Sequence, residues 1–433
     1  MIYRTYLVFL TLSIISCALS VSLSQVFLAV SFVLFLFLNP KPKFQSYLVK
    51  ILFLFYGWQL VSFVYHYVGS GLDSSFVKHA FNEEMKDIFL VTAFFTIQGV
   101  KIEDRKYLTR VLIAFAITIG VTGFISLFSS IRLSRLVSDL YKVSSSWKFQ
   151  HHYGSVLGID VHLPIGFMNT HLTFGGLLMF VYPFFVFHVY DLWKSKAKIL
   201  KLTIWIVLLG MISIVFLFNN ARSALIGMGF SLLLGFYILA FIDDAISKKF
   251  LKRAGISVLI FFAICFIGFK TSEPVQKVIN PLFGGEKHTD SGRTFIWHST
   301  YPLIQANPIF GIGSGKYKEE IEISRKRLSV EEKELSFFYE VTQRGHSHND
   351  YLHLMTIFGI PQFILYLSLM SLILFTLLNK EIPNSAKYLT YGLSGFFFSG
   401  ILQCYFQDDE VLIVFMFLLG YLNIYLEKES AEV

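Results

Sequence analysis

The sequence predicts an all-α polytopic membrane protein of about 12 transmembrane helices, with a large, partly helical loop between spans nine and ten. Hydrophobic residues make up 55% of the 433-residue chain and charged residues only 15%, whereas about a quarter of an average soluble protein is charged. Apolar runs long enough to cross a bilayer, roughly 17 to 25 residues, recur along most of the chain. One helical bundle is therefore expected rather than several soluble domains.

The apolar runs place the spans in order along the chain. We expect helices at residues 5–21, 23–38, 46–67, 88–100, 107–128, 170–190, 202–218, 223–242, 254–269, 351–378, 388–406 and 411–425. Spans one to nine then lie within 1–269, the large loop covers 270–350, and spans ten to twelve with a C-terminal tail cover 351–433. Arg4 precedes the first run in the manner of a signal peptide. Because eleven further spans are expected after it, we expect an uncleaved first span.

The basic residues of the short loops predict the orientation, because cytoplasmic loops carry an excess of Lys and Arg. In the twelve-span arrangement the basic clusters fall on one side, at Lys41, Lys43, Lys50, Lys101, Arg105, Lys106, Arg110, Lys194, Lys196, Lys198, Lys201, Lys248, Lys249, Lys252 and Arg253. That side is expected to be the cytoplasm, and it holds both termini. Segments 68–87, 129–169 and 270–350 then face outward.

The charge and the cysteines exclude several classes of protein. The net charge of +8 does not indicate nucleic acid as a partner, because no basic stripe interleaved with aromatic residues is present. Cys17, Cys265 and Cys404 all fall in expected spans, where a free cysteine behaves as a small hydrophobe, so we expect no disulfide. The spans carry almost no charge, which speaks against an ion-coupled transporter.

The outward loop at 270–350 has the features of a folded, functional segment. Loops above about 15 residues in a compact architecture are usually functional or disordered, and the aromatic residues here favour a folded one. Capping side chains at 289–291 precede an expected helix at 293–305, which Asn307-Pro308 ends. A glycine-rich segment follows, and then a charged, helical stretch at 316–340 that we interpret as a solvated face.

The glycine-rich segment from Gly311 to Lys316 resembles a phosphate-binding loop but does not fit its spacing. Such a loop has four residues between its first glycine and the Gly-Lys pair, and Ser or Thr follows. Here three residues intervene and Tyr317 follows, and the segment is expected to face away from cytosolic nucleotide. We therefore interpret it as a turn.

A dense polar cluster closes the loop directly before an apolar run. His346, His348, Asn349 and Asp350 lie within five residues. Histidine has the side-chain pKa nearest neutrality, so it can take a proton from a hydroxyl and return it. The cluster imitates the His-x-His-x-Asp-His signature of zinc hydrolases, but Tyr351 occupies the last position and a bilayer span follows. A proton-transfer site without a metal is the better interpretation, and a capped loop is the alternative.

Two arginines are expected at the outer mouth of the bundle. Arg222 lies in a short turn between two spans, and Arg293 opens the first expected helix of the loop. A guanidinium is permanently charged and its planar donor fork suits phosphate oxygens; a helix N-terminus adds partial positive charge. No Asp-x-Asp for holding a divalent cation occurs in an outward loop, so these arginines would bind phosphate directly. The alternative for either is snorkelling or contact with a lipid headgroup.

The segment from about residue 166 to 360 resembles the O-antigen ligase and polymerase superfamily of bacterial inner-membrane glycosyltransferases. The resemblance rests on residues 166–175, 219–223, 291–297 with 307–313, and 346–352 with Gly359. A ligase pattern of His, Asn, nine residues, Gly, two residues and a small or aromatic residue is met at His348, Asn349 and Gly359 but ends at Gln362.

The resemblance implies a chemistry for the predicted site. Such enzymes transfer a sugar chain from undecaprenyl diphosphate on the periplasmic face without a metal or another cofactor. By resemblance, Arg222 and Arg293 would engage the diphosphate and His348 would be the essential histidine, acting as a base. In-line attack of an acceptor hydroxyl implies inversion at the anomeric carbon. His171, His346, Asn349, Asp350 and Tyr351 would contribute to substrate binding.

The resemblance favours an O-antigen ligase in the inner membrane, whose acceptor is the lipid A core oligosaccharide. A polymerase of the same superfamily, which uses a second lipid-linked glycan as acceptor, is the first alternative. A lipid-linked sugar transporter and a zinc hydrolase remain as alternatives from other classes. Loss of His348 should affect a transporter only modestly, and a hydrolase should bind stoichiometric zinc.

Overall fold

The computed structural model describes residues 1–38, 46–138, 149–156, 158–244, 288–333, 336–342 and 345–426. Within these residues, six helices are long and apolar enough to cross a membrane, at Tyr47–Gly69, Ile102–Leu127, His171–Lys194, Ile199–Asn219, Arg222–Ile242 and Ile360–Leu377. The predicted class, a helical multi-pass membrane protein, is therefore confirmed. The number of twelve spans stays a prediction, and the expected span at 254–269 lies outside the described residues.

The helices of the first half follow the predicted apolar runs closely. They are α1 (Ile2–Ser16), α2 (Val21–Phe37), α3 (Tyr47–Gly69), α4 (Ser74–Asn82), η1 (Met85–Leu90), α5 (Val91–Ile97), η2 (Ile102–Asp104), α6 (Arg105–Leu127), α7 (Leu133–Ser138), α8 (His171–Lys194), α9 (Ile199–Asn219), α10 (Arg222–Tyr237) and η3 (Ile238–Ile242). The expected span at 88–100 is instead the end of η1 followed by the short α5.

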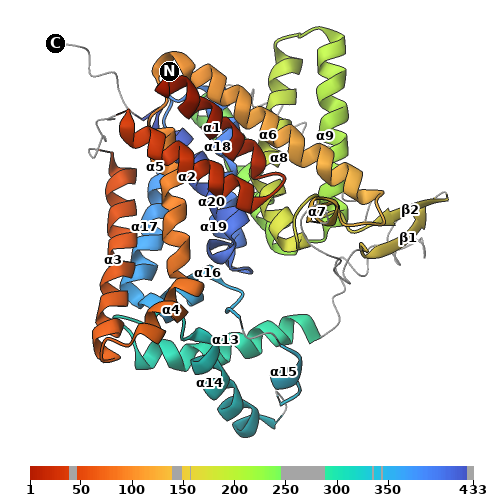
Figure 1. Ribbon diagram of the computed structural model, residues 1–433. Helices are drawn as coiled ribbons and strands as arrows, with labels where there is room; N and C mark the ends of the chain where they lie inside the picture. Colours follow the sequence, from red (N-terminus) through yellow and green to blue (C-terminus); the bar gives the residue numbers. More distant parts are fainter. Residues whose placement is uncertain are drawn as a thin grey trace.

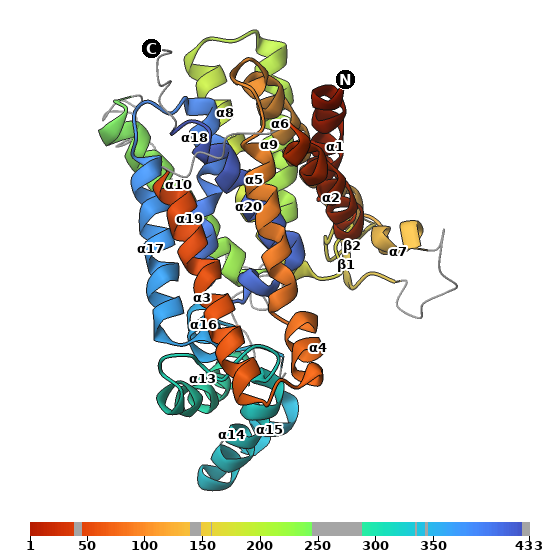
Figure 2. The same cartoon turned by 60° about the vertical axis from the view of Figure 1, so that its left-hand side comes forward.

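The helices of the second half are shorter and more often interrupted. They are α13 (His288–Ala306), α14 (Tyr317–Glu331), α15 (Ser336–Val341), α16 (Asp350–Phe358), α17 (Ile360–Leu377), α18 (Asn384–Thr390), α19 (Gly392–Ser399), η5 (Tyr405–Gln407) and α20 (Asp409–Asn423). Figures 1 and 2 show α13, α14 and α15 together at one end of the bundle, away from the end that holds the N-terminus.

The expected single span at 351–378 is broken at Gly359. This residue has a φ of +83°, a conformation that glycine adopts without strain. A Cβ there would collide with the backbone of Ile309, and the Ile360 N–H donates to the Pro308 carbonyl at 2.7 Å. The turn after α13 therefore packs against the break, which Pro361 in the first turn of α17 also favours.

The expected span at 388–406 is also divided, and this changes the surroundings of one cysteine. Helix α19 ends at Ser399, and a turn leads to η5. Cys404 lies in that turn, where its sulfur accepts the Asn349 N–H at 3.2 Å. The prediction that Cys404 lies inside an apolar span is therefore wrong, because the chain leaves the helix five residues earlier.

The predicted loop at 129–169 contains a small sheet. Strands β1 (His152–Val156) and β2 (Ile159–His162) pair antiparallel, with His152 opposite His162 and Val156 opposite Ile159. The Tyr153 hydroxyl donates to the Phe218 carbonyl at 2.9 Å, so the hairpin lies against the C-terminal end of α9. The predicted all-α class is therefore incomplete, because the protein also contains this two-stranded hairpin.

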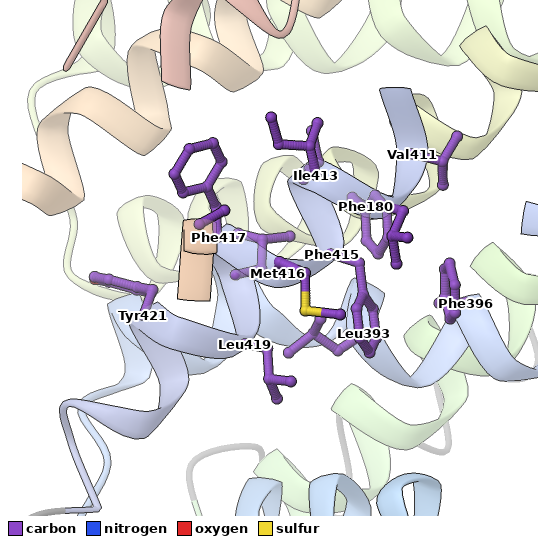
Figure 3. Close-up of a cluster of buried hydrophobic side chains, with 14 of the residues drawn as sticks. Phe180, Leu393, Phe396, Val411, Ile413, Phe415, Met416, Phe417, Leu419 and Tyr421 are labelled. Carbon is purple, nitrogen blue, oxygen red and sulfur yellow. The ribbon is translucent and has the colours of Figure 1, made fainter. Parts of the chain in front are cut away.

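Helix α20 forms the centre of the apolar core. All its residues from 411 to 423 are buried, and it packs along α5 while α10 packs along α19 and α8. Figure 3 shows Phe415 and Met416 of α20 among Leu393 and Phe396 of α19 and Phe180 of α8. This core fixes the turn before α20, and that turn reaches the candidate site.

Candidate active site

The predicted polar cluster forms a strained loop at the start of α16. His348 has a φ of +52°, which is uncommon for a residue with a side chain and is often found at functional sites. Hydrogen bonds hold the neighbouring residues: the Ser347 hydroxyl donates to the Asn349 carbonyl at 2.8 Å, and the Trp297 indole donates to the Ser347 carbonyl at 3.0 Å. The Asn349 side chain caps α16 by accepting the Leu352 N–H at 3.0 Å.

A second segment, residues 400–407 between α19 and α20, holds the cluster from the other side. The Asp350 N–H donates to the Gly400 carbonyl at 2.7 Å, and the Phe406 N–H donates to Oδ1 of Asp350 at 3.0 Å. Nδ1 of His348 lies 3.0 Å from Oε1 of Gln403. Sequence reasoning missed this segment because it took the residues as part of a span, although Gln403 and Gln407 interrupt the apolar run.

The two histidines of the cluster are close together and favour the neutral form. Their ring centroids are 4.4 Å apart, and Nδ1 of His346 accepts the His348 N–H at 3.2 Å. Burial lowers the pKa of His348, the nearby positive charge of Arg293 lowers it further, and the hydrogen bond with Gln403 opposes them. Burial and the neighbouring His348 lower the pKa of His346 to about 3. A neutral imidazole can accept a proton.

Arg293 reaches this site from α13. Its positive charge acts on His348 and on the Tyr405 hydroxyl. Because α13 begins at His288, Arg293 lies in the second turn of the helix, and the prediction that it opens the helix is wrong. The partial charge of the helix N-terminus therefore does not add to that of the Arg293 guanidinium.

Arg222 is the first residue of helix α10. Asn220 turns the chain with a φ of +58°, and Ser223 then places its hydroxyl 3.1 Å from the Tyr405 hydroxyl. Tyr405 is therefore in contact with the start of α10 and under the charge of Arg293. The structure brings the helix start that carries Arg222 to the same end of the bundle as Arg293 and His348.

Comparison with known protein families gives a match to the middle of the chain. Residues 205–367 match the family model described as O-Antigen ligase. This match supports the predicted resemblance to the O-antigen ligase and polymerase superfamily. The match begins in α9 and ends in α17, so it includes Arg222, Arg293 and His348. No curated protein matches the chain. Members of the superfamily are glycosyltransferase-like membrane enzymes, both ligases and polymerases.

The side chains or neighbours of the other predicted site residues are in contact mainly with other parts of the protein. Asp350 is 1% exposed; burial raises its pKa to about 8, and Oδ2 accepts the Tyr366 hydroxyl at 3.4 Å. The Tyr351 hydroxyl donates to the Phe397 carbonyl at 2.9 Å. His171, outside the matched segment, is the first residue of α8, next to Leu172, whose carbonyl accepts the Tyr405 hydroxyl at 3.2 Å.

The side chains of His346, His348 and Asp350 do not form a metal centre within the part of the chain that the structure describes. No group of three or more His, Cys, Asp or Glu side chains there could hold a metal ion. The Asp350 carboxylate points to the 405–406 backbone, and Nδ1 of His346 faces the backbone of His348. The predicted imitation of a zinc signature therefore does not bring its side chains to a common point.

A second buried polar centre lies beside the candidate active site, and sequence reasoning missed it. Oε2 of Glu84, in the short segment after α4, accepts the Gly315 N–H at 2.8 Å. Oε1 of Glu84 lies 3.9 Å from Nε2 of His353, which also contacts Gln407. Burial raises the pKa of Glu84 to about 7. The signal in the sequence is the run of charged residues at 83–87 in otherwise apolar surroundings.

The glycine-rich segment of the large loop is part of this centre. Gly311, Gly313 and Gly315 all have positive φ angles, and a Cβ at Gly311 would collide with the backbone of Ile357. The interpretation of this segment as a turn is confirmed. Nζ of Lys318, just after it, donates to Oε1 of Glu83 at 2.6 Å, so the segment after α4 and the start of α14 are joined next to the site.

Proposed function

We propose that the protein is an O-antigen ligase that transfers a glycan from undecaprenyl diphosphate to a hydroxyl of the lipid A core oligosaccharide on the periplasmic face of the inner membrane. The observation that carries this proposal is a strained His348 whose pKa is lowered by burial and by the charge of Arg293, inside the segment that matches the O-antigen ligase family. A half-buried base and a permanent cation that acts on it are the two kinds of group that can assist glycosyl transfer from a diphosphate.

In this proposal the two arginines bind the diphosphate of the donor. Arg222 is at the N-terminus of the 16-residue helix α10, where the helix dipole favours an anion. Arg293 adds a second guanidinium from α13. The diphosphate is already a good leaving group, so no nucleotide, metal or other cofactor is needed. The arginines stabilise the negative charge that grows on the diphosphate as its bond to the sugar breaks.

His348 is the proposed general base. The oxygen of the acceptor hydroxyl forms a bond to the anomeric carbon from the side opposite the diphosphate, while the bond from that carbon to the diphosphate oxygen breaks. The hydroxyl proton passes to the neutral ring of His348. The products are an inverted glycosidic bond, free undecaprenyl diphosphate and a protonated histidine, which returns its proton to solvent before the next cycle.

The remaining predicted residues are proposed to hold the shape of the site around His348. His346 accepts the backbone N–H of His348, and Asn349 caps α16, so both maintain the shape of the loop beside the substrate. His171, Asp350 and Tyr351 line or support the same end of the bundle. Both termini are placed in the cytoplasm by the basic residues of the short loops, and the apolar outer faces of the spans contact membrane lipids.

A polymerase is the second candidate, and one observation favours it. Gln362 stands where the ligase pattern has a small or aromatic residue, and its side chain is buried at the first turn of α17. A polymerase would use the same donor site and base, and its acceptor would be the sugar of a second lipid-linked glycan. The two functions therefore differ in the acceptor alone.

Reconstitution with two acceptors tests the proposal. The purified protein in liposomes is given a lipid-linked glycan together with lipid A core oligosaccharide, or the lipid-linked glycan alone, and products are separated by mass. Ligation predicts a glycosylated lipid A core and no chain extension without it. Extension of the lipid-linked glycan alone would replace the ligase by the polymerase. No product with either acceptor, from protein that binds the donor, would reject both.

A further inference from the structure

Gln403 contacts the proposed base from a part of the chain that the family match does not cover. It lies in the turn between α19 and η5 and is 6% exposed. Its Oε1 is 3.0 Å from Nδ1 of His348. A buried amide oxygen at this distance from a ring nitrogen is a hydrogen-bond acceptor, so the contact defines which nitrogen of the ring carries the proton.

The tautomer of His348 decides whether it can act as a base. A neutral imidazole has one N–H and one nitrogen with a free lone pair, and the partner of one nitrogen determines the state of the other. Because the oxygen of Gln403 only accepts, Nδ1 carries the hydrogen. Nε2 then has the lone pair that can take the proton of an acceptor hydroxyl.

The backbone around Gln403 is held by contacts that its side chain does not make. The Gly400 carbonyl accepts the Asp350 N–H, the Cys404 sulfur accepts the Asn349 N–H, and Oδ1 of Asp350 accepts the Phe406 N–H. These bonds join residues 349–350 to residues 400–406 on both sides of Gln403. The side chain of Gln403 therefore contacts the ring of His348 without being needed to hold the backbone of the turn.

We propose that Gln403 is a positioning residue, which holds the ring of His348 with Nδ1 protonated and Nε2 available to the acceptor hydroxyl. The proposal rests on the proposed function, in which His348 is the base. Because the amide of Gln403 is neutral, it leaves His348 uncharged before the reaction. It keeps accepting from Nδ1 when the ring becomes protonated, so it also supports the cation that transfer produces.

Two substitutions separate positioning from a structural role. Gln403→Met has a similar length but no acceptor, so the ring loses its fixed tautomer and kcat should fall about 10- to 100-fold while KM for the lipid-linked donor stays unchanged. Gln403→Glu keeps the acceptor and adds a negative charge, which raises the pKa of His348. Its rate should approach that of the wild type at high pH, and the acid limb of its kcat–pH profile should move to higher pH.

The experiment uses the full-length protein in liposomes with the lipid-linked glycan and the acceptor that the reconstitution identifies. Thermal unfolding of each variant verifies the fold. Gln403→Met is also made in a His348→Ala background, where it should cause no further loss because Gln403 acts through His348. Wild-type kcat in Gln403→Met, an unmoved acid limb in Gln403→Glu, or equal losses at every pH in both variants would overturn the positioning role. Full activity of His348→Ala alone would instead overturn the proposed base.

Discussion

Helix α20 and the 400–407 segment before it are adjacent in the chain but are stabilised by different interactions. In α20, residues 411–423 are all buried, and Phe415 stacks on Phe396 with centroids 4.4 Å apart. In the 400–407 segment the contacts are polar: Gln403 meets His348, and Cys404 meets Asn349. The first region is a close-packed apolar core, and the second is a buried polar loop held by that core.

This difference between apolar packing and polar contacts explains why the proposed catalytic residues lie beside the 400–407 segment and not beside α20. An apolar helix in a bundle is defined by packing, and no titratable group is needed for it. A buried polar loop must satisfy each of its groups with a specific partner, which fixes side chains such as His348 in one orientation. Substitutions in the polar loop should therefore change activity, and substitutions in the apolar core should change stability.

The largest expected effect is on the polar side, at His348. His348→Ala removes the proposed base, so turnover should fall by about 10²- to 10⁴-fold, while donor affinity and thermal unfolding change little because the donor is held elsewhere. His298→Ala is the matched control, since His298 is exposed on α13. Turnover and donor binding are measured separately on purified protein. Wild-type transfer by His348→Ala would remove this residue from catalysis.

The arginines should give the next largest effect. Arg293→Lys keeps the charge but loses the planar fork, and Arg222→Ala loses both, so each should lower transfer by about 10²- to 10³-fold. Arg222→Ala should also weaken donor binding. Arg327→Lys is the control, because Arg327 is 59% exposed on α14 and pairs only with Glu331 among the ion pairs described for it. Unchanged donor affinity and rate in both variants would leave the diphosphate clamp unsupported.

The sequence predicted the apolar region better than the polar one, for a physical reason. Apolar runs are local patterns, so α3, α6, α8, α9 and α10 lie within a few residues of their expected positions. The His346–Asp350 cluster was also visible, because its residues are consecutive. The contact of Gln403 with His348 joins positions 55 apart, and that of Glu84 with Gly315 joins positions 231 apart. Such pairings leave no periodic pattern in a single sequence.

The breaks in the later helices were partly visible. Gly359 followed by Pro361 is a signal for the end of one helix and the start of another, but the hydropathy of the run outweighed it. The turn at 400–407 gave less indication, since Gln403 and Gln407 are its main polar residues between apolar neighbours. In the hairpin at 152–162, Ile159 and Val161 alternate with polar residues, a pattern that is typical of strands.

On the apolar side, the expected effect is on stability rather than on chemistry. Phe415→Ala removes a fully buried ring and should lower the free energy of unfolding by roughly 2–4 kcal/mol, mainly through lost packing contacts, since lipid replaces water as the surroundings. Phe375→Ala is the matched control, because Phe375 is 70% exposed on α17. Unfolding is followed in mixed detergent. Equal stability of the two variants would mean that α20 does not hold the core together.

The smallest expected effect is at Glu84, whose buried carboxyl joins the segment after α4 to the glycine-rich segment. Its pKa is raised by burial from 4.5 to about 7, so the folded protein binds this proton more tightly than the unfolded chain does. Between about pH 4.5 and about pH 7 the unfolded chain has lost the proton while the folded protein retains it, and stability therefore falls as the pH rises through this window.

Glu84→Gln tests this dependence, because the amide keeps an oxygen that can accept the Gly315 N–H but has no proton to lose. The midpoint of thermal unfolding, measured at constant ionic strength, should fall less between about pH 4.5 and about pH 7 in Glu84→Gln than in the wild type. Glu319→Gln, at an exposed position on α14, should keep the wild-type slope. A slope unchanged by Glu84→Gln would show that the segments are joined without this proton, leaving the bond between Lys318 and Glu83 as the contact to remove next.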